Sequence, residues 1–185
     1  MIDPTSPLTS NGNILLYVGH PTIMIITWLT FDDTLHSFVE YGEKQMNMSI
    51  EGSCAVFIDP ENSALWRYIH RATLTQLVAG TTYRYRVGSN YGWSSVFSFT
   101  ALSPREGGGY ELAVYGDLGN ENARSLGKIQ KLAQDGEIDM VLHVGDFAYN
   151  MDTDNGRVGD EFNRQIEPVA AYVPYMTAVG NHEVS

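Results

Sequence analysis

The hydrophobic pattern of the chain changes at residues 103–109, which read Ser-Pro-Arg-Glu-Gly-Gly-Gly. Before this segment, short apolar runs alternate with turn residues, and no helix-length pattern interrupts them. After it, strand-length apolar runs alternate with helical periodicity. Because a proline and three consecutive glycines disfavour regular structure, we interpret the segment as a linker. The 185 residues therefore divide into an all-β domain, residues 11–103, and an α/β domain, residues 104–185.

The first domain is predicted to be an antiparallel β-sandwich. Its runs are rich in β-branched and aromatic residues and are separated by turn signals, a pattern typical of sandwiches. The expected strands are residues 14–18, 22–28, 37–41, 55–58, 66–74, 82–87 and 96–100. Tyr83 opens a late strand just after a glycine-containing turn, as in a tyrosine corner, and Trp28 fits the buried tryptophan of an early strand. The segment resembles a fibronectin type III-like domain.

The second domain is predicted to contain a parallel sheet. Apolar strands are expected at residues 111–115, 139–144 and 175–179. Residues 121–135 place Leu126, Ile129 and Leu132 on one helical face, and residues 161–172 form a second helical pattern interrupted by Pro168. An alternation of strand, helix, strand, helix and strand implies right-handed crossovers between parallel strands.

Each of these three strands is followed by a polar signature. The signatures are Gly116-Asp117, Gly145-Asp146-Phe147-Ala148-Tyr149 and Gly180-Asn181-His182-Glu183. Ligands bind outside the carboxyl ends of parallel strands, so the three clusters should converge at one edge of the sheet. Carboxylate and amide oxygens are hard metal ligands, and a phenolate suits a trivalent iron. A carboxylate can also bridge two cations about 3.5–4 Å apart, the spacing used for attack at phosphorus.

In order and spacing, the three signatures resemble those of the metallophosphoesterase superfamily. The Gly-Asp-x-x-Tyr variant is similar to the purple acid phosphatases, and residues 67–74 and 92–99 resemble their N-terminal β domain, closest to the animal long-form type. The resemblance implies that Asp117 and Tyr149 bind Fe(III), that Asp146 bridges two metals, and that Asn181 binds a second divalent metal (Zn, Mn or Fe). His182 would contact the substrate phosphate. The implied reaction is hydrolysis of phosphate monoesters at acidic pH.

The family pattern also includes three histidine ligands that residues 1–185 do not supply. His20, His36 and His70 lie in the β domain, and His143 is interpreted as a core or supporting histidine three residues before Asp146. We therefore expect weak metal binding and little activity from this incomplete metallophosphoesterase domain, with one sheet face exposed. The alternative is a truncated, non-catalytic isoform that acts as a binding or regulatory β-sandwich module.

Composition and local sequence bear on partners and compartment. A net charge of −11 argues against nucleic-acid binding. The apolar stretch 14–29 is broken by Gly19-His20-Pro21, so no membrane span is expected. The family is secreted or lysosomal, whereas the first residues lack the features of a signal peptide. Asn47-Met48-Ser49 is a glycosylation acceptor, Cys54 is expected to be a buried thiol, and the oligomeric state is open.

Overall fold

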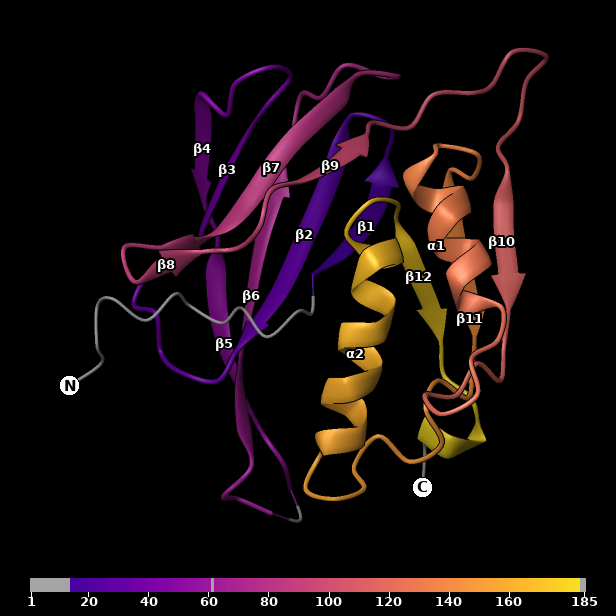
Figure 1. Ribbon diagram of the computed structural model, residues 1–185. Coiled ribbons are helices and arrows are strands. Elements are labelled where there is room, and N and C mark those ends of the chain that lie inside the picture. Colours follow the sequence, from indigo (N-terminus) through magenta and orange to yellow (C-terminus); the bar gives the residue numbers. More distant parts are fainter. Residues whose placement is uncertain (1–13, 61, 184–185) are drawn as a thin grey trace.

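The computed structural model describes residues 14–60 and 62–183 (Figure 1). The first residues, on which the expectation about a signal peptide rests, lie outside this range, as do residues 11–13 of the expected β domain.

Two antiparallel sheets form the first part of the chain, which confirms the sandwich. The strands are β1 (Leu15–His20), β2 (Ile23–Thr30), β3 (Phe38–Gly42), β4 (Met48–Glu51), β5 (Ser53–Ile58), β6 (Trp66–Leu74), β7 (Thr82–Ser89), β8 (Gly92–Trp93) and β9 (Phe97–Thr100). One sheet has the order β1-β2-β6-β5, and the other has the order β4-β3-β7-β8 with β9 also paired to β7. The short strands β4 and β8 are not among the expected ones.

The sandwich core contains the two aromatic residues that the sequence singled out. Trp28 is 3% exposed and stacks on the buried His70 ring. Tyr83 is also buried, and its hydroxyl accepts a hydrogen bond of 3.0 Å from the backbone N–H of Val78. This bond to the preceding turn is the tyrosine corner predicted from the sequence.

Three parallel strands and two helices form the second part. They are β10 (Leu112–Tyr115), α1 (Leu126–Gln134), β11 (Met140–Val144), α2 (Arg157–Ala170) and β12 (Tyr175–Ala178), followed by the 3₁₀ helix η1 (Asn181–Glu183). The strand order is β10-β11-β12, with both pairs parallel. α1 begins five residues later than expected and α2 four residues earlier. Pro168 lies inside α2 near its carboxyl end, where a missing N–H removes only one late hydrogen bond.

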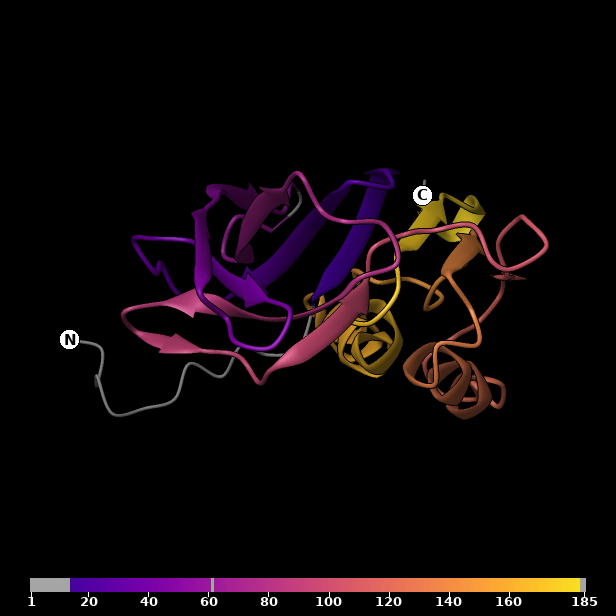
Figure 2. The same ribbon diagram turned by 90° about the horizontal axis from the view of Figure 1, so that it is seen from above.

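Both helices lie on the same face of this sheet (Figure 2). The opposite face presents Leu112, Val114 and Val144, which are 40%, 59% and 56% exposed. The expected exposure of one apolar face is therefore observed in the described residues. Among the described residues, no helix is long and apolar enough to cross a membrane.

The two parts of the chain pack against each other. The Tyr85 hydroxyl donates a 2.8 Å hydrogen bond to the carbonyl of Ala171, which is itself buried in the sandwich core. Leu16 of β1 forms a parallel bridge with Pro174, just before β12. The linker is also anchored, because Nε of Arg105 donates to a carboxylate oxygen of Asp139 at 2.7 Å. These contacts hold α2 beside the sheet that contains β1, β2, β6 and β5.

The expectation that Cys54 is buried is wrong. Cys54 lies on β5, where it is an exposed free cysteine. β5 is the last strand of its sheet, and all six of its residues are exposed. An edge strand has a neighbour on one side only, so an apolar pattern on it does not imply burial.

Candidate metal centre

The polar residues that follow the three parallel strands lie together at the carboxyl edge of the sheet. Asp117 follows β10, Asp146 and Tyr149 follow β11, and Asn181 and His182 lie in η1 after β12. In Figure 1 these segments meet near the end marked C. The right-handed crossovers through α1 and α2 bring all three strands in the same direction, so their ends share one edge.

Hydrogen bonds and one ring contact join the three clusters. The Tyr149 hydroxyl donates a 2.9 Å hydrogen bond to Oδ1 of Asp117, 32 residues earlier in the chain. The backbone N–H of His182 donates to Oδ1 of Asp146 at 3.2 Å. The His182 ring also meets the Tyr149 ring edge-on, with 5.0 Å between centroids. Asn181 is exposed beside His182 on η1.

The backbone at these residues is unusual. Asp117, Asp146, Tyr149 and Asn150 have φ values of 53°, 51°, 54° and 74°, in the left-handed region. Non-glycine residues adopt this region at a cost of about 1 kcal/mol or more each, and they persist there when the surroundings hold them. Four such residues at one sheet edge are typical of a site whose side chains must point in particular directions.

Two glycines allow the second and third loops to approach closely. A Cβ on Gly145 would lie 2.7 Å from Cα of Gly180. A Cβ on Gly180 would overlap Oδ1 of Asp146 and lie 2.6 Å from its backbone nitrogen. Real Cβ atoms do not come so close to other atoms, so both positions require glycine. The Asp146 carboxylate therefore sits in a cradle that a side chain at residue 180 would fill.

Glu183 holds the same two loops together, a role that the sequence analysis missed. Its carboxylate accepts hydrogen bonds from the backbone N–H groups of Asp146, Phe147 and Gly180 at 2.9, 2.8 and 2.7 Å. Burial tends to raise the pKa of this carboxyl, but the three donors together hold it below its ordinary value. An acidic residue after Asn-His was visible in the sequence, but two of its three partners lie 36 and 37 residues earlier in the chain.

His143 supports the site from inside the sheet. It is fully buried on β11, and its Nδ1 lies 2.8 Å from the Tyr175 hydroxyl, which is hydrogen bonded to the Tyr115 hydroxyl. Its Nε2 has no partner among the described residues. Burial lowers the pKa of His143 to about 4, although the carboxylates of Glu183 and Asp117 act in the opposite direction.

The low pKa of His143 predicts a loss of stability in acid. The unfolded chain gains a proton on this ring near pH 6.5, whereas the folded chain does so only near pH 4. The contribution of His143 is therefore complete above pH 6.5 and is lost as the pH falls to 4, by roughly 3 kcal/mol in the free energy of unfolding. Urea unfolding of residues 1–185 and of the His143→Phe variant between pH 7 and pH 4 measures this. The unmodified chain should lose more stability than the variant as the pH falls, and parallel curves would contradict the prediction.

The residues present fit a metal centre with oxygen ligands. Two carboxylates, a phenol and an amide at one edge form a hard donor set, with Asp146 placed between the other loops. The hydrogen bond to Asp117 raises the pKa of the Tyr149 phenol. The phenol must lose its proton before its oxygen can bind a metal. The described residues contain no group of three or more histidine, cysteine, aspartate or glutamate side chains in metal-binding geometry.

Hollows lie at both edges of the parallel sheet, but only one adjoins the candidate centre. A hollow of about 400 Å³ is lined by His182, Glu183 and the loop residues Met151, Asp152 and Asn155. The 150–156 loop therefore lies at the edge of the hollow that contains His182.

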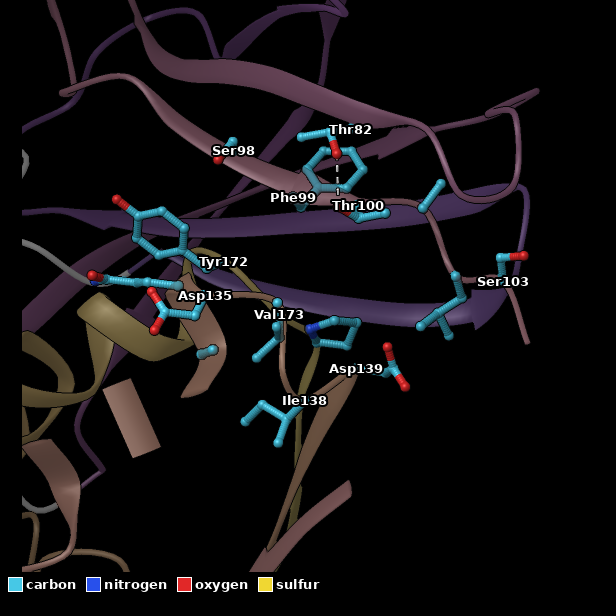
Figure 3. Close-up of a pocket in the computed structure, with 16 residues that line it drawn as sticks. Thr82, Ser98, Phe99, Thr100, Ser103, Asp135, Ile138, Asp139, Tyr172 and Val173 are labelled. Atoms are coloured by element: carbon cyan, nitrogen blue, oxygen red, sulfur yellow. Dashed lines mark hydrogen bonds between the residues drawn. The ribbon is translucent and has the colours of Figure 1, made fainter. Parts of the chain in front are cut away.

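The other hollow, about 330 Å³, lies where β11 and β12 begin (Figure 3). Thr82 and Thr100 of the sandwich are hydrogen bonded to each other there, opposite Asp139. None of the predicted ligands lines this second hollow.

Comparison with known proteins gives two family matches. Residues 12–101 match the purple acid phosphatase N-terminal domain, and residues 110–185 match the calcineurin-like phosphoesterases. The chain is 46% identical over 170 residues to acid phosphatase type 7 of Danio rerio, covering 90% of this chain and 38% of that protein. The human protein of the same name is also 46% identical, over 91% of this chain and 39% of its own length.

A solved structure gives the same match. The purple acid phosphatase from yellow lupin seeds (Lupinus luteus) superposes with a TM-score of 0.71 at 29% identity, over 92% of this chain and 35% of that one. The chain thus spans about two fifths of the length of the relatives it matches.

Proposed function

Because the chain belongs to the purple acid phosphatase family, we propose that residues 110–183 supply part of a binuclear metal site that hydrolyses phosphate monoesters. The hydrogen bond between Tyr149 and Asp117 carries this proposal, since it joins the first two signatures at the edge where the third also lies. When bound, two metal ions lower the pKa of water and neutralise the phosphoryl oxygens.

The residues are assigned distinct roles. Asp117 and Tyr149 would hold the iron, Asp146 would serve both metals, and Asn181 would hold the second metal, which would be Zn, Mn or Fe. His182 contacts the phosphate. Its Nδ1 is 3.0 Å from Oδ1 of Asn150, so that hydrogen bond fixes the ring and leaves the other nitrogen to donate to a phosphate oxygen when the ring is protonated. Glu183 and His143 position these groups without binding metal.

Residues 1–185 alone are expected to bind metal weakly. His20, His36 and His70 are hydrogen bonded within the sandwich, and His143 is buried behind the site, so none of them is available as a ligand. Missing imidazoles reduce affinity for both metals. Among the described residues of the three signatures, His182 is the only histidine.

The test compares two polypeptides at pH 5 with p-nitrophenyl phosphate as substrate. The full-length protein that carries these residues should hydrolyse it, should lose activity on chelation, and should recover with iron and zinc. Residues 1–185 alone should show less than about a hundredth of that turnover under the same conditions, because even supporting groups around a metal change activity 10–100-fold. Robust turnover by residues 1–185 would contradict the assignment of ligands.

We also assign the protein to a secreted or lysosomal compartment. The support is Asn47, an exposed loop residue just before β4 in an Asn-x-Ser triplet, which a glycosyltransferase could reach. Treatment of the native protein with an endoglycosidase should lower its mass, and Asn47→Gln should abolish that change. An unchanged mass in both cases would remove this support.

A further inference from the structure

A third hollow adjoins the one that His182 lines. It has a volume of about 340 Å³ and lies between the β5–β6 hairpin and the first turns of α2. The residues common to both hollows are Asp59, Leu65, Met151 and Asp152. The two hollows therefore form one groove, which leads from the predicted phosphate site to the outer face of the sandwich. In Figure 1 the hairpin, the amino end of α2 and η1 all lie at the lower end of the molecule.

The far end of this groove is apolar. Leu29 and Ile69 are cross-strand partners and present their side chains on the same face, and Phe57 of β5 lies beside them. Leu65 and Met151 complete the walls. Phe57 is 45% exposed although it is a large aromatic residue on an edge strand. Such exposure invites unwanted association, so a ligand that covers the ring accounts for it.

The cation in the groove is already engaged. Arg67 donates from Nε to Oδ1 of Asp160 at 3.3 Å and from a second nitrogen to Oδ2 at 2.5 Å. Its guanidinium also lies over the Phe31 ring, 4.3 Å from the centroid. Both side chains of the ion pair are largely buried, at 15% and 12% exposed. A paired and stacked guanidinium offers little to a second anion.

The charge at the junction of the two hollows is negative. The carboxylate of Asp152 lines both hollows, whereas Arg67 is paired with Asp160. A group that reaches from the phosphate site to the apolar end lies beside this carboxylate. Because like charges repel, a leaving group that carries its own carboxylate or phosphate is disfavoured there.

We propose that this groove holds the leaving alcohol of the phosphate ester and selects alcohols that are aromatic or bulky and apolar, without negative charge. The inference rests on the proposed function, because it takes His182 to mark the phosphate. Its specificity residues come from the sandwich, with Phe57 as the main apolar contact. The N-terminal domain then contributes directly to substrate choice.

Binding can be tested without catalysis on residues 1–185. 2-Naphthol is the neutral probe, followed by its own fluorescence, and 2-naphthoate is its anionic counterpart. The naphthol should bind saturably, and Phe57→Ser should weaken it about tenfold, as expected for losing much of one aromatic contact. Val56→Ser is the matched control, since Val56 is 54% exposed on the opposite face of β5. Equal affinity for naphthoate, or no effect of Phe57→Ser, would overturn the proposal.

A kinetic comparison in the full-length protein separates this proposal from the proposed function. Phe57→Ser should lower the ratio of kcat/KM for 2-naphthyl phosphate to kcat/KM for methyl phosphate about tenfold. An unchanged ratio in an active enzyme would overturn the subsite alone. Hydrolysis of neither ester by the unmodified protein would overturn the proposed function, and the subsite with it.

Discussion

Replacing Asp146 with asparagine should lower kcat/KM for a phosphate monoester by more than about 100-fold, with loss of bound metal. Supporting groups around metal ligands change affinity or activity 10–100-fold, and a carboxylate that serves two metals should exceed that range. Asparagine keeps an oxygen in the position that accepts the His182 N–H, so the loop geometry is retained. What is lost is the negative charge and the second oxygen donor.

The comparison needs both metal content and activity. Metal per protein, measured by mass spectrometry after gel filtration, should fall together with turnover, whereas the unfolding temperature of the metal-free protein should change little. Asp135→Asn is the matched control, because Asp135 is an exposed carboxylate that pairs with Lys131 at the carboxyl end of α1. An Asp146→Asn protein that keeps two metals and full turnover would show that Asp146 does not bridge them.

Much of this arrangement was predictable because it follows from patterns that can be read directly along the sequence. Alternating β-branched and aromatic residues define the long strands, and the parallel order follows from the alternation of strands and helices. The rule that ligands bind at the carboxyl ends of parallel strands brought Asp117, Asp146 and Asn181 to one edge without any structure. The tyrosine corner at Tyr83 was predictable for the same reason, since its partner lies only five residues away.

The features that could not be predicted depend on contacts that the local sequence pattern does not specify. β8 is two residues long and exists because it pairs with β7. Cys54 is exposed because β5 is an edge strand, and the sequence pattern does not reveal which strand is last in a sheet. Glu183 acts on a loop that folding brings close, and the groove near Phe57 exists because α2 packs against the sandwich. Each of these depends on strand pairing or tertiary packing that the local sequence pattern does not specify.

Close packing between the loops of the site also determines how the site tolerates change. Gly180→Ala should reduce kcat/KM about 100-fold and lower the free energy of unfolding by about 1–3 kcal/mol. The new methyl group would overlap Oδ1 of Asp146 and lie 2.6 Å from its backbone nitrogen. Overpacking of this kind costs about 1–3 kcal/mol, and a shift of about 1 Å in a catalytic group can cost 10²-fold in rate. The shift also moves the N–H groups that bind Glu183.

Gly127→Ala is the control for the same chemical change. Gly127 lies exposed in α1 with nothing within 4 Å of a new Cβ, so the variant should gain up to about 1 kcal/mol in stability and keep its activity. Urea unfolding and steady-state kinetics of the two variants give the comparison. If Gly180→Ala kept both its stability and its turnover, the Asp146 carboxylate would not be held in a tight cradle. If it lost stability but bound metal normally, the cradle would serve folding and not the metal centre. The expected result is a joint loss, because one methyl group displaces both the carboxylate and the backbone that supports it.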